Sequence, residues 1–543
     1  MPFNVSIIRY FCLALAGLVC LSACSKQENK TVNPDEKALH LSVGASPQSL
    51  DPHVATGVPA IKILTGLGER LVSIDLTTLE VVPALATHWE ISNDGKRYVF
   101  HLRKEGRWSD GSEVTAADFV YAWRRALTPT VGWQYANDYH IIAGAEAFNK
   151  GENTDFASVG VKALDAYTLE FTLRSAQPLF LRKLTPETLM PVHQASLEKH
   201  GAMDDVSTAW TKAGNFVSNG AFRLLRWEVN KIIELEKNPH YWNADSVKLD
   251  KIYLYPIETE SAEERAFRAG QINLAFGGRI PVSKIASYQK KAPEKLKLVS
   301  AYATYFYLFN VTQPPFDDVR VRKAFTHAID RDSIVKNITK AGEGVANTLT
   351  PPTPGYSEGV GVLTYDAELA RKYLAEAGYP GGKDFPSITL IYNTADLHRK
   401  VALVIQQMWR TELGIDVTLE NQEWKVFLDT RQSLNFNVAR AGSVSGIADP
   451  SDFLDTYQTG HGMNDTGWSN FEFDALIKLS SETIDQSERY RILAQAEAIL
   501  LEELPLIPLY YYTNSYLIDD TVKGLTFNPI SRINFSDIDI VNE

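Results

Sequence analysis

The cysteines of this 543-residue chain are confined to its first 24 residues, at Cys12, Cys20 and Cys24. Neither a disulfide framework nor a cysteine-ligated metal site is therefore available to the rest of the chain. Stability has to come from apolar packing, which a hydrophobic content of 45% permits. Because a chain of this length is too long for one core, we expect two to four domains.

The first 24 residues have the pattern of an export signal. An apolar run follows Arg9, and small residues precede Cys24. The ending Leu-Ser-Ala-Cys resembles the bacterial lipobox, whose cysteine is diacylated and becomes the new N-terminus. We therefore expect a signal peptide at 1–23, a disordered tether at 24–39, and a protein exported to the periplasm or cell envelope and lipid-anchored through Cys24. An ordinary cleaved signal with an accidental cysteine is the alternative.

Composition and motifs argue against several classes of function. A net charge of −12 disfavours nucleic acid and anionic membrane surfaces as partners. No H-E-x-x-H motif or phosphate-binding glycine loop occurs, and no two histidines stand at i and i+4, so no zinc site is indicated. The G-x-S-x-G match at 355–359 lies among prolines and glycines, which excludes the strand and helix that a nucleophile elbow requires. We expect no enzyme activity, no catalytic residues, no cofactor and no metal.

Strand and helix patterns alternate along the chain from residue 39 without a fixed repeat. Alternation at 167–173 predicts a strand, and apolar segments at 89–92 and 98–100 flank an Asn-Asp-Gly turn, which predicts a hairpin. Helices are predicted at 366–377, capped by Asp366, and at about 486–503. Such mixing predicts an α/β (mixed α+β) fold.

Several motifs together resemble the peptide-binding members of the family 5 solute-binding proteins, which serve ABC importers. Each motif alone is ordinary turn chemistry, but five follow in the family's order across residues about 40–543. Further runs at 393–398, 423–425, 427–431 and 438–442 are similar to those of oligopeptide-binding members. The five are Trp108-Ser-Asp-Gly with Thr115 to Tyr121, Ser218 to Leu224, Glu236 to Asn243, Phe316 to Ala324, and Pro508 to Tyr512.

The resemblance implies a three-domain, two-lobe clamshell with mixed sheets that closes over its ligand. Its first domain would be discontinuous, formed by 40–58, 200–302 and 513–543. The second would be 59–199, in the same lobe, and the third, 303–512, would form the other lobe. The partners implied are a peptide or peptide-like ligand and an inner-membrane ABC permease, and we expect a monomer. Alternatives are a ligand-sensing receptor without transport and an envelope peptidase or amidase.

The resemblance also implies a ligand site. Basic side chains would hold the ligand's carboxylate end, and strand edges would pair with its backbone. The alternative to ligand contact is pairing with surface carboxylates for Arg431 and Arg440, and a helix-capping or exposed position for His398. The implied basic residues are His398, Arg431 and Arg440, with Gly442 offering backbone groups, Trp424 as a pocket wall, and Tyr135 as a further candidate.

This chain departs from the family pattern where an aspartate grips the ligand's amine. Gly446 stands at the aspartate's place, beside Ser445, and Ser443 replaces an expected tryptophan. At two further positions where the related oligopeptide site has acidic residues, this chain has Ser46 and Leu308. The two cysteines of the disulfide that the resemblance implies correspond to Ala303 and Val444.

Burying an ammonium without a partner costs several kcal/mol. We therefore hypothesise a blocked, modified or non-peptide anionic ligand. An ordinary peptide whose amine is held by Asp449 or Asp452 is the alternative.

Overall fold

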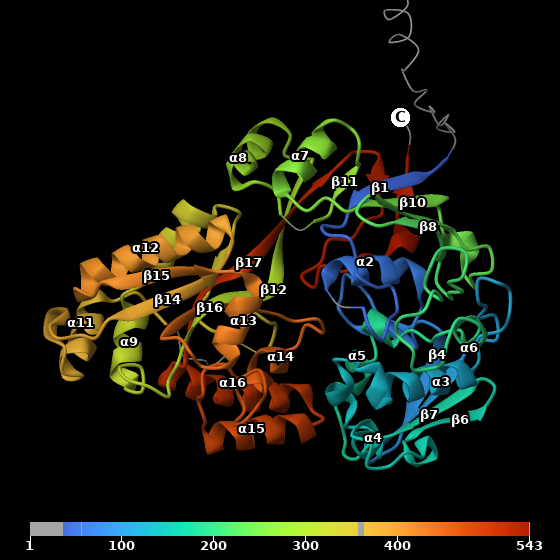
Figure 1. Ribbon diagram of the computed structural model, residues 1–543, viewed down its shortest axis with the longest axis horizontal. Helices are drawn as coiled ribbons and strands as arrows, with labels where there is room; N and C mark the ends of the chain where they lie inside the picture. Colours follow the sequence, from blue (N-terminus) through green and yellow to red (C-terminus); the bar gives the residue numbers. More distant parts are fainter. Residues whose placement is uncertain (1–35, 56, 278, 357–362, 542–543) are drawn as a thin grey trace, which may run out of the picture. The chain divides into compact units, whose positions relative to one another are not determined.

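Two long antiparallel strands run through the largest sheet, β12 (Leu296–Phe309) and β17 (Leu506–Ile518) (Figure 1). The computed structural model describes residues 36–55, 57–277, 279–356 and 363–541, and those from Ala38 onward form one compact unit. The β12–β17 pairing shifts register at two places, between Ser300 and Thr304 and between Tyr305 and Phe306. Ser300 lies opposite Thr513 and Thr304 opposite Tyr511, so three residues of β12 face a single residue of β17. A bulge of this kind bends the paired strands locally.

The sheet around these strands is mixed. Only the pairs β1–β10, β1–β11, β14–β15 and β14–β16 are parallel among the described pairs. On one side of the β12–β17 pair, in sheet order outward from β12, lie β16 (Val438–Val444), β14 (Ile388–Asn393) and β15 (Val417–Gln422). On the other side, outward from β17, lie β11 (Leu274–Ala275), β1 (Ala38–Ser42), β10 (Lys251–Tyr255), β9 (Ile232–Lys237) and β8 (Phe222–Glu228), while β13 (Gly344–Val345) also pairs with β17.

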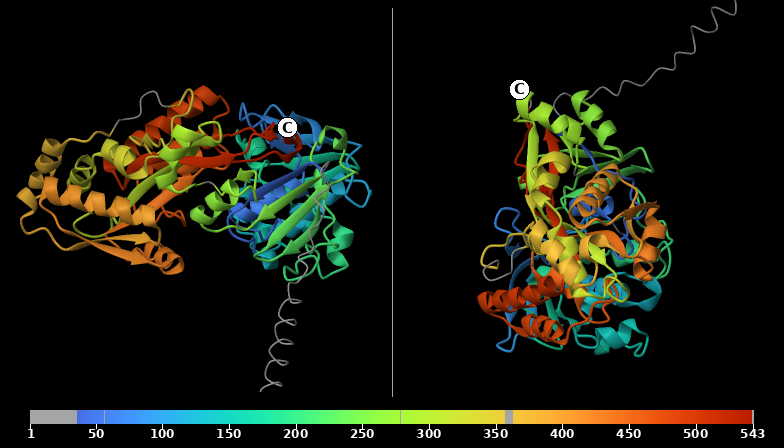
Figure 2. Two further views of the ribbon diagram at one scale, coloured as in Figure 1. Left: turned by 90° about the horizontal axis from the view of Figure 1, so that it is seen from above. Right: turned by 90° about the vertical axis from the view of Figure 1, so that its left-hand side faces the viewer.

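Helices cover both parts of this sheet (Figures 1 and 2). Beside β14 and β16, the fully buried Trp409 of α12 packs with Phe325 of α9, and its indole N–H donates to the Phe325 carbonyl. Beside β1 and β9, the buried residues Ile63 and Leu64 of α2 share a core with Leu41 and Ile233. The helices are α9 (Val319–His327), α11 (Ala367–Glu376), α12 (Asp396–Leu413) and α2 (Val58–Leu67).

A separate four-stranded antiparallel sheet contains the predicted hairpin. Its order is β4 (Ala86–Ile91), β5 (Arg97–Leu102), β7 (Thr168–Thr172) and β6 (Val161–Asp165). Gly95 supplies the left-handed conformation in the β4–β5 turn, with φ of 67°. The hairpin and the strand predicted at 167–173 are therefore both confirmed.

The two predicted helices are also confirmed. The Asp366 side chain accepts a hydrogen bond from the Leu369 N–H and caps α11. Helix α16 spans Gln486–Glu503, as expected from the sequence, and packs beside α15. The mixture of strands and helices confirms the expected α/β (mixed α+β) class.

The other elements are shorter. Among the described residues, no helix is both long and apolar enough to cross a membrane. The remaining strands are β2 (Val72–Ile74), β3 (Val81–Pro83), β18 (Val522–Lys523) and β19 (Asp539–Ile540). The remaining α-helices are α3 (Ala116–Leu127), α4 (Ala145–Asn149), α5 (Phe180–Lys183), α6 (Gln194–Glu198), α7 (Glu260–Arg268), α8 (Val282–Lys291), α10 (Arg331–Ile334), α13 (Trp424–Gln432), α14 (Ser451–Leu454) and α15 (Phe471–Glu482).

Candidate ligand-binding site

Arg440 projects from β16 onto a cluster of tyrosines. Its guanidinium lies 4.8 Å from the centre of the Tyr305 ring, Nη2 donates to the Tyr512 hydroxyl at 2.5 Å, and Nη1 donates to Asn393 Oδ1 at 3.4 Å. Tyr510 stacks on Tyr305 with ring centres 4.6 Å apart. In the part of the chain that the structure describes, no carboxylate lies within ion-pair distance of Arg440. The Arg440 charge is thus held by neutral oxygens and aromatic faces alone.

His398 lies beside Arg440, in the first turn of α12. It is only 5% exposed, its ring centre is 5.5 Å from that of Tyr305, and Nδ1 has no hydrogen-bond partner among the described residues. Burial, together with the nearby charges of Arg440 and Arg279, lowers the pKa of His398 to about 3. The imidazole is therefore neutral at physiological pH, and the alternative of an exposed histidine at this helix start is excluded.

Arg431 is compensated by a carboxylate, unlike Arg440. It lies in α13, and its Nε and Nη2 donate to Asp465 Oδ2 at 3.0 and 2.5 Å. The Asp465 side chain is 8% exposed and that of Arg431 17%. Removing one partner of such a pair would leave an uncompensated buried charge. The structure therefore does not present Arg431 as a free cation beside Arg440.

Gly442 lies on β16, and Gly446 lies in the loop that follows this strand. A Cβ added at Gly442 would lie 3.0 Å from the Tyr512 hydroxyl and 3.3 Å from Nη2 of Arg440, so the bare backbone lets these two groups meet. Gly446 is exposed, and an added Cβ would meet nothing within 4 Å. Ser443 is half-buried and Ser445 is buried. A side chain at Gly446 would thus have open space, whereas one at Gly442, although that residue is also exposed, would meet Tyr512 and Arg440.

The acidic residues that follow differ in their partners. Asp449 is buried and accepts two hydrogen bonds from Arg489, at 2.8 and 2.5 Å. Burial opposes ionisation of Asp449, but the Arg489 hydrogen bonds and charge hold its pKa below the ordinary value. Asp452 accepts the Ser445 hydroxyl at 2.6 Å, and burial raises its pKa to about 6 despite that bond. Asp449 is therefore already neutralised, whereas no cation is hydrogen-bonded to Asp452 among the described residues.

Comparison with known proteins identifies the class of binding protein. The description "Bacterial extracellular solute-binding proteins, family 5 Middle" matches residues 80–465. The chain belongs to this family. Its members are non-enzymatic binding proteins that act outside the cytoplasm, which confirms the expected family, the absence of catalysis and the extracytoplasmic location.

Similar proteins cover nearly all of the chain. The periplasmic oligopeptide-binding protein OppA of Escherichia coli is 36% identical over 503 residues, which are 91% of this chain and 90% of that protein. A probable deoxycholate-binding periplasmic protein, YgiS of E. coli, is 35% identical and covers 95% and 96%. The solved structure of the murein tripeptide binding protein MppA of E. coli aligns with a TM-score of 0.80 at 33% identity, covering 94% and 99%. The fold of this family member is therefore that of the periplasmic binding proteins.

The two positions that the resemblance matches to a disulfide are neighbours in this chain. Ala303 of β12 lies directly opposite Val444 of β16 in the antiparallel pair. The correspondence inferred from sequence therefore places both residues at one cross-strand position, and neither carries a thiol.

The other predicted site residues share no described hydrogen bond or ring contact with Arg440. Ser46 Oγ accepts the Asn230 N–H, and Tyr135 is 36% exposed with its ring edge against Trp133. Leu308 is 2% exposed within a hydrophobic core, so the structure places it inside the protein rather than on a pocket wall. The side chain of Trp424 lies outside the described residues, as does Cys24.

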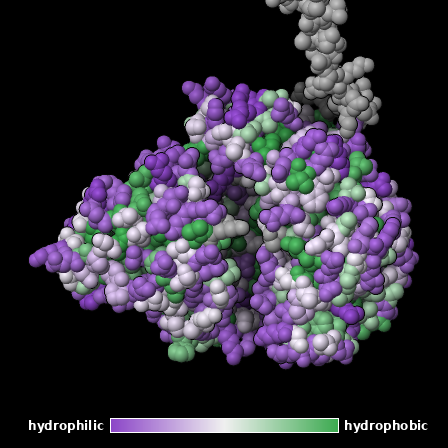
Figure 3. Space-filling view, in the orientation of Figure 1, coloured by the Kyte–Doolittle hydropathy of each residue, from purple (hydrophilic) through white to green (hydrophobic). Residues whose placement is uncertain are grey.

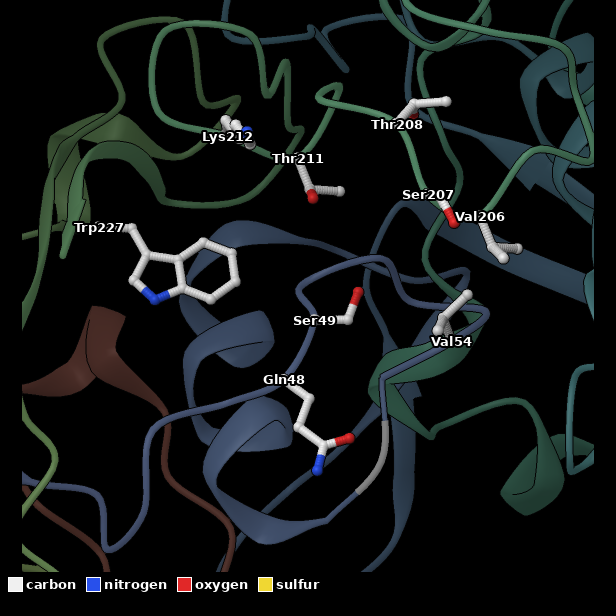
Figure 4. Close-up of a pocket in the computed structure, with 9 residues that line it drawn as sticks. All are labelled: Gln48, Ser49, Val54, Val206, Ser207, Thr208, Thr211, Lys212 and Trp227. Atoms are coloured by element: carbon white, nitrogen blue, oxygen red, sulfur yellow. The ribbon is translucent and has the colours of Figure 1, made fainter. Parts of the chain in front are cut away.

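A polar pocket elsewhere in the structure contains none of the predicted residues (Figure 4). Its volume is about 360 Å³, and Lys212 is the one ionisable side chain in its lining. The lining residues are Gln48, Ser49, Val54, Val206, Ser207, Thr208, Thr211, Lys212 and Trp227.

Sequence reasoning missed the neutral partners of Arg440, although Tyr512 ends one of the five family motifs. It also missed Arg279, whose guanidinium lies 5.4 Å from the centre of the Tyr512 ring. Period-two alternation along β17 could have singled out Tyr510 and Tyr512 as neighbours on one face. No local pattern pointed to Arg279.

The lowered pKa of His398 has a consequence for stability. An unfolded histidine has a pKa near 6.5, so stability from the neutral ring is present above that pH and is lost as the pH falls toward 3. Between pH 7 and 5 we expect a loss of about 2 kcal/mol in the free energy of unfolding from this residue. The His398→Gln variant should lack this part of the pH dependence in denaturant titrations, and the wild-type ring proton signals should not titrate between pH 5 and 8. A His398 ring that titrates near pH 6.5 would contradict the buried neutral state.

Proposed function

We propose that this chain is the lipid-anchored substrate-binding protein of an ABC importer and that it captures a peptide or peptide-like solute bearing a carboxylate. The observation that carries the proposal is the group formed by Arg440, His398 and the tyrosines. A desolvated guanidinium without an anion is costly, and a bidentate carboxylate is the partner that its geometry fits. The N-terminal end of α12, which carries His398, adds a favourable dipole for an anion.

The proposed capture mechanism is closure of two lobes joined by β12 and β17. We place the first domain at 40–58, 200–302 and 513–543, the second at 59–199 and the third at 303–512. The bulge opposite Tyr512 coincides with the boundaries between the first and third domains. Figure 3 shows the surface hollowed between the part carrying α12 to α16 and the part carrying α2 to α6. A ligand held on both sides would favour the closed state, which the permease would recognise.

The amine end of the ligand is where this protein departs from its family. Gly446 offers no carboxylate, and Asp449 is occupied by Arg489. We therefore propose a ligand that has an anionic end but no free amine at this position, such as a blocked or modified peptide or a non-peptide carboxylate. The relatives named for oligopeptides, a murein tripeptide and deoxycholate span this range of chemistry, since deoxycholate is a carboxylate without an amine.

A second candidate is an ordinary peptide whose amine is held by Asp452. This carboxylate follows the Gly446 loop closely, accepts hydrogen bonds from the Ser445 hydroxyl and the Ile447 backbone, and lies near the charge of Lys183. Its pKa near 6 means that it is mostly ionised at neutral pH. Binding an ammonium there would lower that pKa further.

Calorimetric titration with a tripeptide in free, N-acetylated and C-amidated forms tests both candidates. For the wild type we expect N-acetylation to leave affinity unchanged or improve it, and C-amidation to weaken it at least about tenfold, as should Arg440→Met. Gly446→Asp should raise affinity for the free peptide about tenfold and leave the acetylated one unimproved, because the site has room for the side chain. Gly446→Asn is the matched uncharged control.

The outcomes separate the two candidates. Tight binding of the free peptide that is lost on acetylation and in Asp452→Asn would replace the first candidate with the second. Binding that is insensitive both to C-amidation and to Arg440→Met would contradict the proposed carboxylate site itself.

The lipid anchor at Cys24 is a separate proposal that rests on the lipobox resemblance. We expect the mature protein to begin at Cys24, to carry a diacylglycerol and to fractionate with membranes. Cys24→Ala should abolish the lipid mass and release the protein into the soluble envelope fraction. A mature protein of unmodified mass that starts elsewhere would refute the anchor.

A further inference from the structure

We propose that His88, Glu90 and His101 form a binding site for a divalent transition-metal ion on the β4–β5 hairpin. Each side chain offers one ligand atom, and the three atoms lie within 4.8 Å of one another. Two imidazoles with a carboxylate suit Zn²⁺ and similar ions rather than Mg²⁺ or Ca²⁺, which prefer oxygen ligands alone. The site does not depend on the proposed solute site and involves none of its residues.

Strand geometry brings the three residues together. His88 and Glu90 are two positions apart on β4, so their side chains share one face. In the antiparallel register of the hairpin, His101 of β5 lies directly opposite His88. The two imidazole rings stack with centres 4.3 Å apart and planes inclined by 11°. His88 and Glu90 are exposed, which leaves room for water at a further coordination position.

A hydroxyl beside the site holds the His88 ring at its Nδ1 edge. Thr87 Oγ1 lies 3.1 Å from the His101 carbonyl oxygen and 2.9 Å from His88 Nδ1. In the Nδ1–H tautomer of His88, the hydroxyl accepts from the ring and donates to the carbonyl, and Nε2 keeps the free lone pair that a metal requires. This is the outer hydrogen bond that orients metal-ligating histidines in general.

The spacing of the other two ligands matches a zinc site. His101 Nε2 lies 3.2 Å from Glu90 Oε1. Ligands 2.0–2.1 Å from a tetrahedral Zn²⁺ are about 3.3 Å apart, so a metal could replace the shared proton with little movement of either side chain. The Asp165 carboxylate interacts electrostatically with His101 and adds negative charge beside the site.

Zinc titration of the chelator-treated full-length mature protein tests this inference. We expect one saturable Zn²⁺ site per chain by calorimetry and no response to MgCl₂. His88→Gln and His101→Gln should each weaken binding at least tenfold. Thr87→Val, which removes only the orienting hydroxyl, should weaken it by about tenfold. His240→Gln changes an exposed histidine outside the cluster and should leave the affinity unchanged.

Thermal melting by circular dichroism verifies that each variant is folded, and Co²⁺ absorption reports the ligand set independently of affinity. The inference is overturned if the wild type shows no saturable zinc site, or if folded His88→Gln and His101→Gln variants bind zinc as tightly as the wild type. Because peptide titrations use other residues, failure here would leave the proposed solute site untouched.

Discussion

The pairing of β12 with β17 holds the two sides of the large sheet together. β12 pairs with β16 on one side and β17 pairs with β11 on the other. Apart from β13, the remaining strands of the large sheet follow outward from these two pairings. The β12–β17 pairing shifts register at two places, and Tyr512 lies opposite the larger bulge, between Ser300 and Thr304. Tyr512 also accepts a hydrogen bond from Arg440. A bend at this point would therefore move Tyr512 and Arg440 together with the strands.

Charge compensation decides which of the buried ionic groups remain available to bind a charged ligand. Arg431 and Asp449 look like site residues by position, yet each has a buried partner of opposite charge, Asp465 and Arg489. Arg440 has only neutral partners among the described residues. Because a buried charge is costly without an opposite charge nearby, Arg440 is the group with most to gain from an anionic ligand. The contrast indicates that an anionic group of the ligand would bind at Arg440 rather than at Arg431.

Local patterns predicted much of the fold, since they are encoded over a few residues. The Asn-Asp-Gly turn predicted the hairpin, Asp366 predicted a helix cap, and the hairpin register alone would have placed His88 opposite His101. A search limited to helical i, i+4 spacing missed that cross-strand pair. The partners Asp465 and Arg489 lie 34 and 40 positions from theirs, and nothing local specifies such pairs. The burial of Leu308 likewise follows from tertiary packing, which position in a family alignment does not reveal.

If a bound solute closes two lobes around the β12–β17 strands, the molecule becomes more compact. Small-angle X-ray scattering of the protein, free and saturated with a ligand identified by native mass spectrometry, measures this change. We expect a smaller radius of gyration for the bound protein, and a weaker effect in Arg440→Met at the same ligand concentration. An unchanged radius of gyration with a tightly bound ligand would rule out lobe closure.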